Sequence, residues 1–174
     1  DRPSGLAEPG VTIEQVMQYA LAAAERENDV FDAAIFANYL YAFRPGDFFD
    51  ELIVRFARSG VDSVVPTLND YQCCWVDHGG RLDRVDSGFR PREMRSPLQR
   101  GFVGLGCITS TEFIREGRLL GDSIDLIPFG DPWYSLKAGD RFGDAIVRQA
   151  FEQGVELFGP AMLDESAAQA AKGP

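Results

Sequence analysis

The chain of 174 residues has few of the residues that usually build metal, disulfide and nucleic-acid sites. Its only histidine, His78, precedes two glycines in a predicted turn, and no spaced set of cysteines and histidines suggests a zinc site. The three cysteines are an odd number and two are adjacent, so we expect reduced thiols without a disulfide framework. The formal net charge of −10 argues against a nucleic-acid partner, because affinity for phosphate backbones comes mostly from lysine and arginine.

Long apolar runs are also missing. No run approaches the roughly 18 residues needed to cross a bilayer, and no basic-then-apolar leader opens the printed sequence, so we expect a soluble, cytoplasmic protein without membrane contact. The length suits one domain with a real core. We expect a single α/β domain over residues 1–158 and a disordered, alanine-rich tail over residues 159–174.

Helical and strand-like segments alternate in the first half of the chain. Thr12 and Gln15 have capping-box spacing, and apolar residues then recur at helical intervals to Glu27. A short apolar run over residues 31–36 predicts a buried strand. The next predicted helix begins after Asp47 and ends at Gly60, and a strand is expected over residues 61–67.

This alternation predicts the fold class. Nearly continuous apolar strands separated by helices are typical of a mostly parallel sheet with helices on both faces, a Rossmann-like arrangement. In such sheets ligands bind beyond the carboxyl ends of the strands, so the segments after Asn38 and Thr67 are the expected mouth of a site.

The second half departs from the alternation. Residues 71–90 predict an inserted β-hairpin arm, because two strand-like runs flank the turn at Asp77–Gly80. Further along, the pattern predicts a short helix over residues 109–116, short strands over residues 124–127 and 133–136, and a last helix over residues 140–158.

A glycine-rich apolar run, residues 101–108, stands between these parts and is typical of a buried strand. Arginines precede it at positions 90, 92, 95 and 100. Glycines that allow close approach, together with arginines, suit an anionic ligand. A core strand with a solvated basic loop explains the same residues equally well.

Several segments in a fixed order carry a resemblance to a known family. They are Asn38 through Arg44, the DSVV run at residues 62–65, Pro91-Arg92, the GLGC run at residues 104–107 and IREGRLLG at residues 114–121. This order resembles the acylneuraminate cytidylyltransferase family, the enzymes that make CMP-sialic acid and CMP-ketodeoxyoctonate. The resemblance implies an α/β nucleotidyltransferase domain, usually a homodimer, in which an acidic sugar attacks the α-phosphate of CTP and pyrophosphate leaves.

The resemblance also implies site residues. Substrate-binding positions match Asn38, Arg44, Arg92 and Gly104. The family holds Mg²⁺ with an Asp-x-Asp motif, and the matching positions here are Ser135 and Lys137. Asp140 and Asp144 are nearby carboxylates and are therefore the candidate metal ligands. A lysine at a ligand position would repel the ion.

One part of the family pattern has no counterpart. The family opens with a glycine-rich loop whose amides cradle phosphates, and this sequence matches the family only beyond that loop. We therefore expect a fragment that binds CTP poorly by itself. One alternative is a noncatalytic sugar-acid-binding or dimerisation module that dimerises through residues 71–90, and another is an unrelated α/β domain.

Overall fold

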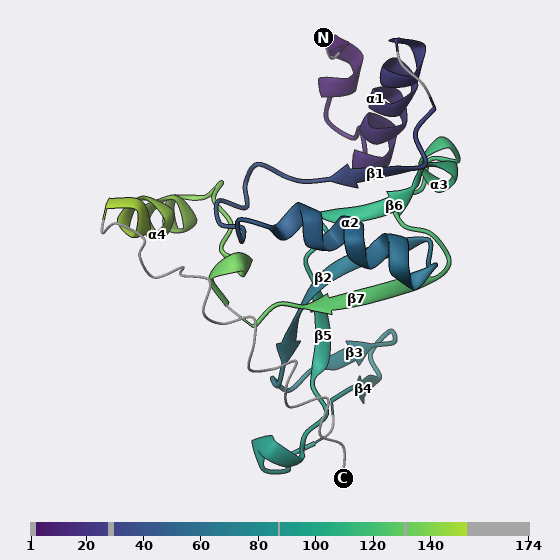
Figure 1. Cartoon of the computed structure of the whole chain (residues 1–174). Helices are drawn as coiled ribbons and strands as arrows, with labels where there is room; N and C mark the ends of the chain where they lie inside the picture. Colours follow the sequence, from purple (N-terminus) through teal and green to yellow (C-terminus); the bar gives the residue numbers. More distant parts are fainter. Residues whose placement is uncertain (1–2, 28–29, 87, 131, 153–174) are drawn as a thin grey trace.

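The computed structural model describes residues 3–27, 30–86, 88–130 and 132–152 (Figure 1). Its helices are η1 (Ser4–Ala7), α1 (Ile13–Glu27), α2 (Phe48–Ser59), η2 (Arg92–Met94), α3 (Thr111–Arg115), η3 (Pro132–Ser135) and α4 (Arg141–Glu152). Its strands are β1 (Ala33–Phe36), β2 (Ser63–Asp70), β3 (Trp75–Asp77), β4 (Leu82–Arg84), β5 (Leu98–Gly101), β6 (Cys107–Ser110) and β7 (Ile124–Pro128). The predicted tail, residues 159–174, lies outside the described residues, as does the end of the last predicted helix.

Local signals set the ends of the first two helices. Before α1, Thr12 N–H donates to Gln15 Oε1 at 2.9 Å and Gln15 N–H donates to Thr12 Oγ1 at 3.4 Å. This is the reciprocal bonding of a capping box. Helix α2 ends at Gly60, whose φ of 67° suits a residue without a Cβ atom. Asp47 occupies the N-cap position of α2 without a side-chain capping bond.

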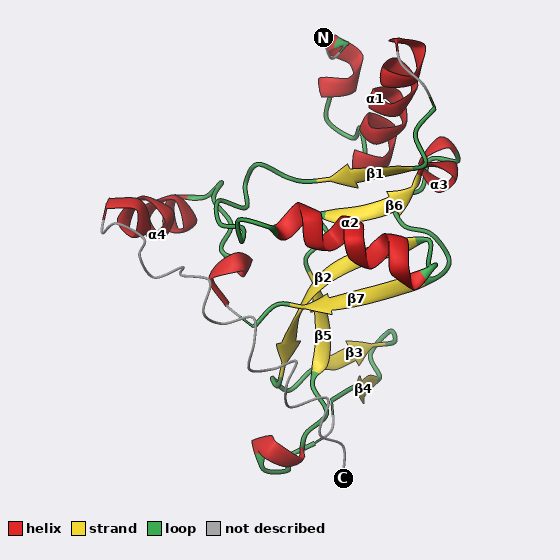
Figure 2. Cartoon of the chain, in the orientation of Figure 1, coloured by secondary structure: helices red, strands yellow, loops and turns green. Residues whose placement is uncertain are grey.

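The prediction of a mostly parallel sheet is wrong. Strand β6 lies between β1 and β2 and runs antiparallel to both, and β5 is antiparallel to β2 (Figure 2). Only the pair of β2 with β7 is parallel among the described strands. Strands β1 and β2 do point the same way, as the alternation with α2 predicts, but β6 separates them. A strand's hydrophobic pattern reports its burial and does not report which strand pairs with it.

The glycine-rich run is not one strand. β5 ends at Gly101 and β6 begins at Cys107, and a turn closed by the Leu105 N–H donating to Phe102 C=O at 2.9 Å separates them. Gly106 lies where an added Cβ atom would come within 2.5 Å of the Phe48 ring. Glycine at this position therefore serves the packing of α2 against this turn. Another predicted strand, residues 133–136, is largely the 3₁₀ helix η3.

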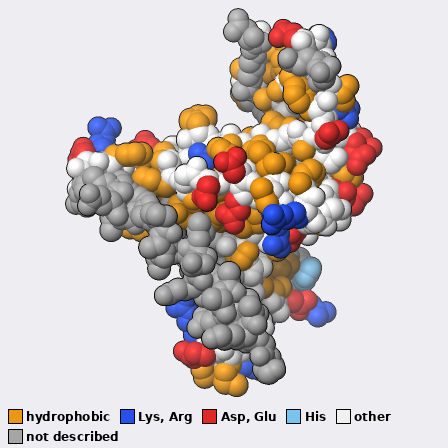
Figure 3. All heavy atoms as spheres, viewed as in Figure 1, with side chains coloured by type: hydrophobic (Ala, Val, Ile, Leu, Met, Phe, Trp, Pro, Cys, Tyr) orange, Lys and Arg blue, Asp and Glu red, His pale blue; other side chains and the backbone are white. Residues whose placement is uncertain are grey.

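The core lies between α2 and the sheet, because α2 lies across one face of the strands (Figure 2). Its buried members are Phe48, Leu52, Val64, Leu105, Ile108, Ile127 and Phe129. Hydrophobic side chains also gather on the outer face of α2 (Figure 3), where Phe49, Ile53 and Val54 are exposed. None of the helices among the described residues is both long and apolar enough to cross a bilayer.

The predicted arm position holds a separate two-stranded sheet. β3 and β4 pair antiparallel, from Trp75 opposite Arg84 to Asp77 opposite Leu82. This hairpin lies beyond the end of the main sheet at which β5 is found (Figure 1). It connects β2 to the segment that carries Arg92.

Candidate functional site

Two loops meet at the end of β1 and bring together three of the four predicted substrate-binding residues. The Asn38 N–H donates to the Gly104 C=O at 2.8 Å, which joins the loop after β1 to the turn before β6. Arg44 Nη2 donates to the Asn38 C=O at 2.8 Å. We name Asn38, Tyr41, Arg44, Arg100 and Gly104 the β1-end cluster.

Arg44 holds this cluster together through main-chain bonds. Its Nε donates to the Leu105 C=O at 2.7 Å, its Nη1 to the Tyr41 C=O at 2.8 Å, and its Nη2 to Asn38. Burial lowers the pKa of this guanidinium. All three of its nitrogens serve the two loops, so Arg44 fixes their shape, and a substrate-binding role for it stays a prediction.

Gly104 leaves room for an aromatic ring. A Cβ atom at this position would lie 2.7 Å from the Tyr41 ring. That ring packs edge-on against Phe102, with centroids 6.4 Å apart, and the Arg100 guanidinium lies 5.1 Å from the Phe102 centroid. Glycine here is therefore a packing requirement of Tyr41.

Arg100 is the exposed charged side chain of the cluster, and Tyr41 supplies its phenolic hydroxyl. The Arg100 side chain is 55% exposed, and its Nε lies 3.8 Å from Asp70 Oδ2, which is a long ion-pair distance. Burial raises the pKa of Tyr41, and the nearby charge of Arg100 opposes that rise. A cation and a neutral hydroxyl can together bind a carboxylate.

Arg92, the fourth predicted residue, belongs to another part of the molecule. Its guanidinium lies 4.8 Å from the centroid of the Tyr71 ring and lines a cavity of about 1300 Å³, which we name the α2–β7 groove. The groove runs between α2, the segment from Asp125 to Gly130, and the residues around Arg92. Asn38, Arg44 and Gly104 are not among its described lining residues.

The two candidate metal ligands accept main-chain hydrogen bonds at the start of α4. Asp140 Oδ1 accepts hydrogen bonds from the Phe142 N–H at 2.9 Å and the Gly143 N–H at 2.7 Å. Asp144 Oδ1 accepts one from the Gly139 N–H at 2.9 Å. The positive end of a helix dipole disfavours a cation, so this pair does not fit Mg²⁺.

No other metal site emerges from the part of the chain that the structure describes. It contains no group of three or more histidine, cysteine, aspartate or glutamate side chains that could hold an ion. The three cysteines are all free. The prediction of a magnesium cofactor therefore stays a prediction without a fitting set of described ligands.

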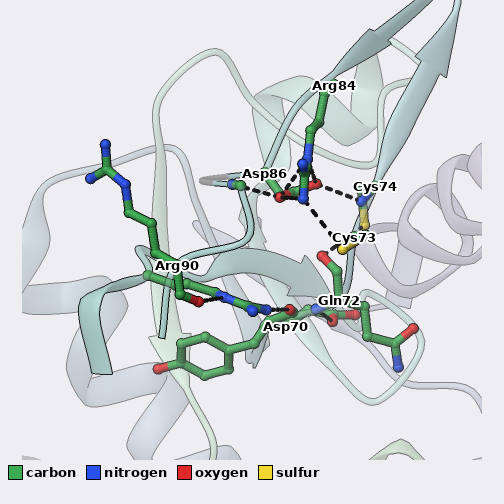
Figure 4. A network of polar contacts seen from close by, with 10 residues as sticks. Asp70, Gln72, Cys73, Cys74, Arg84, Asp86 and Arg90 are labelled. Carbon is green, nitrogen blue, oxygen red and sulfur yellow. Dashed lines mark hydrogen bonds and ion pairs between the residues drawn. The ribbon is translucent and has the colours of Figure 1, made fainter. Parts of the chain in front are cut away.

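A polar network stiffens the arm (Figure 4). Arg84 pairs with Asp86 at 2.8 Å and donates to Cys73 Sγ at 3.4 Å, while Asp86 accepts from the Cys74 N–H at 2.9 Å. The bonds from Arg84 hold the pKa of Asp86 well below its usual range. The Arg84 guanidinium also lies 4.1 Å from the centroid of the Phe89 ring.

Sequence reasoning missed Arg58 as a groove residue. Position 58 is on the polar side of a predicted amphipathic helix, which is normally solvated, and nothing local shows that Asp125–Gly130 faces it. In the sequence, Arg100 is one of four arginines of a basic run, with nothing that distinguishes it from the other three. Neither residue carries a local signal that distinguishes it from a surface arginine.

The chain matches no protein-family model, and no curated protein matches it significantly.

Proposed function

We propose that this chain binds an acidic sugar, of the nonulosonic or ketodeoxy kind, at the β1-end cluster, as the sugar-binding part of a cytidylyltransferase. The observation that carries the proposal is that Asn38, Arg44 and Gly104, matched to the family on sequence order alone, contact one another through the chain fold. In this proposal Arg44 shapes the site, while Arg100 and the Tyr41 hydroxyl hold the carboxylate.

Transfer of CMP requires groups beyond those that bind the sugar. Donors must cradle the triphosphate of CTP, and Mg²⁺ must offset its charge. Asp140 and Asp144 are engaged at the start of α4, so the proposal covers sugar binding and assigns no nucleotide-binding role to the described residues. A cytoplasmic location belongs to the same proposal, since free cysteines are typical of that compartment.

Isothermal titration calorimetry tests the sugar proposal. Sialic acid and ketodeoxyoctonate are each titrated into the chain, with and without CTP and Mg²⁺. We expect saturable binding of at least one acid that does not depend on CTP. Arg100→Gln should weaken it about tenfold, because a charge-assisted hydrogen bond is worth about 1.5–3 kcal/mol.

Arg90→Gln is the matched control, because Arg90 is also an exposed arginine of the basic run and lies outside the cluster. It should leave the affinity unchanged. Absence of saturable binding to both acids would overturn the proposal, as would binding that Arg100→Gln does not weaken. Tight, magnesium-dependent binding of CTP would contradict the restriction of the proposal to sugar binding.

Dimerisation through the arm is the second candidate function. Trp75, Leu82 and Phe89 are 51%, 65% and 79% exposed, although the Arg84–Asp86 network holds the arm in shape. Exposed apolar side chains on an ordered element are typical of a protein interface. Light scattering after size exclusion should give a dimer, and Leu82→Asp should give a monomer; a monomeric wild-type chain would exclude this candidate.

A further inference from the structure

We propose that the α2–β7 groove is a second binding site, separate from the β1-end cluster, for the oxyanion of a small phosphate- or carboxylate-bearing molecule. Its walls bring together side chains from α2, from the ends of β2 and β5, and from η2. A volume of about 1300 Å³ is ample for a small ligand.

The arginines of the groove differ in their partners. Arg55 is bound bidentately by Asp125, with Nε–Oδ2 at 2.5 Å and Nη2–Oδ1 at 3.0 Å. Within the described ranges, no carboxylate lies within 4 Å of the guanidinium of Arg58 or Arg92. The Tyr71 ring orients Arg92, whose guanidinium lies 4.8 Å from its centroid. Two guanidiniums from different elements are thus left to face a ligand.

Two amide side chains that line the groove, Asn69 and Gln99, add N–H donors. Thr67 Oγ1 donates to Gln99 Oε1 at 2.9 Å, and Gln99 Nε2 donates to Asn69 Oδ1 at 2.7 Å. Both side-chain carbonyl oxygens are therefore occupied. The groups that remain for a ligand are N–H donors of Asn69 and Gln99, from which an oxyanion can accept hydrogen bonds.

Two carboxylates are among the described lining residues of the groove, Glu51 and Asp125. Asp125 is paired with Arg55, which also holds the pKa of Asp125 below its usual range. Burial raises the pKa of Glu51, and repulsion from Asp47 raises it further. The described lining thus holds the two guanidiniums of Arg58 and Arg92 against one carboxylate, Glu51, that has no ion-pair partner.

The backbone beside the groove favours a small molecule over an added peptide strand. The Phe129 N–H donates to the Thr67 C=O on β2. The backbone N–H and C=O groups at the alternate positions 126 and 128 therefore point away from β2, along the outer edge of β7. Pro128 has no N–H, and the Leu126 N–H already donates to Asp125 Oδ1 at 2.9 Å. An edge blocked in this way resists strand addition.

Titration with inorganic phosphate, and separately with acetate, tests the site by ¹H–¹⁵N NMR of the arginine Nε–H and the side-chain amides. We expect saturable shifts at Arg58, Arg92, Asn69 and Gln99 with at least one anion. Phosphate saturating at lower concentration would assign a phosphate ligand, and acetate doing so would assign a carboxylate ligand. Shifts that stay linear with both anions would overturn the proposal.

Variants separate this site from the proposed sugar site. Arg58→Gln and Arg92→Gln should each weaken anion binding about tenfold, and Arg90→Gln should not change it. Arg100→Gln, which should impair sugar binding, should leave the groove's response intact. A loss of anion binding in Arg90→Gln equal to that in Arg58→Gln and Arg92→Gln would show general charge attraction and would overturn the proposed site. Thermal unfolding midpoints check that each variant is folded.

Discussion

The β1-end cluster and the α2–β7 groove both contain arginines, but they use them differently. In the cluster, every nitrogen of Arg44 donates to a main-chain carbonyl of the two loops that it joins. In the groove, Arg58 and Arg92 lie on separate elements, and neither is within ion-pair distance of a carboxylate in the described part of the chain. Of the two arginines that match the family, Arg44 thus bonds to main-chain carbonyls while Arg92 lines the groove, so a motif position does not by itself tell which role an arginine has.

The largest expected difference between the two regions is in stability. Arg44→Met removes three hydrogen bonds and leaves the carbonyls of Asn38, Tyr41 and Leu105 without this donor. We expect the free energy of unfolding to fall by about 3 kcal/mol. Arg58→Met, on the exposed face of α2, should change it by less than about 0.5 kcal/mol. Urea denaturation measures both, and equal losses would contradict the contrast.

A smaller effect is expected from the glycine of the cluster. Gly104→Ala places a Cβ atom 2.7 Å from the Tyr41 ring and should cost about 1–3 kcal/mol of unfolding free energy. Gly46→Ala is the matched control, since nothing lies within 4 Å of its added Cβ atom. A stability of Gly104→Ala equal to that of the control would show that the ring moves away without cost.

The smallest effect is expected in the groove. Asp125→Asn removes the ion pair with Arg55, whose side chain is 52% exposed, and should cost about 0.5 kcal/mol at neutral pH. Bonding from Arg55 lowers the pKa of Asp125 in the folded chain, so this contribution is present above the unfolded value of about 3.9 and is lost as the pH falls below it.

Denaturation midpoints of wild type and Asp125→Asn should therefore differ at pH 7 and converge near the folded-state pKa. A difference that persists unchanged at the lowest pH would exclude the ion pair as its source.

The two edge strands of the sheet also differ, in whether their outward backbone groups are free. On β1, the Thr111 N–H donates to the Asp32 C=O and the Asn38 N–H donates to the Gly104 C=O. The backbone N–H and C=O groups of alternate residues, such as Ala33 and Ile35, therefore point away from β6. On β7, Pro128 and the bonded N–H of Leu126 block the outward edge. Apolar edge residues without such protection can accept a further strand.

The sequence by itself determined the local features of this protein. The capping box at Thr12 and Gln15, and the stop of α2 at Gly60, could be predicted because each depends on residues within one or two helical turns. The turn at Asp77–Gly80 that joins the two strands of the arm is also local. These signals fix where elements begin and end.

Only the tertiary structure decided which strands pair and which arginines have hydrogen-bond or ion-pair partners. Three features join residues that are far apart in the chain. They are the insertion of β6 between β1 and β2, the hydrogen bond from Arg44 to Leu105, and the ion pair of Arg55 with Asp125. Such contacts depend on which surfaces the packed core brings together. Periodicity within a segment carries no information on that choice, and for that physical reason a predicted parallel sheet became a mixed one.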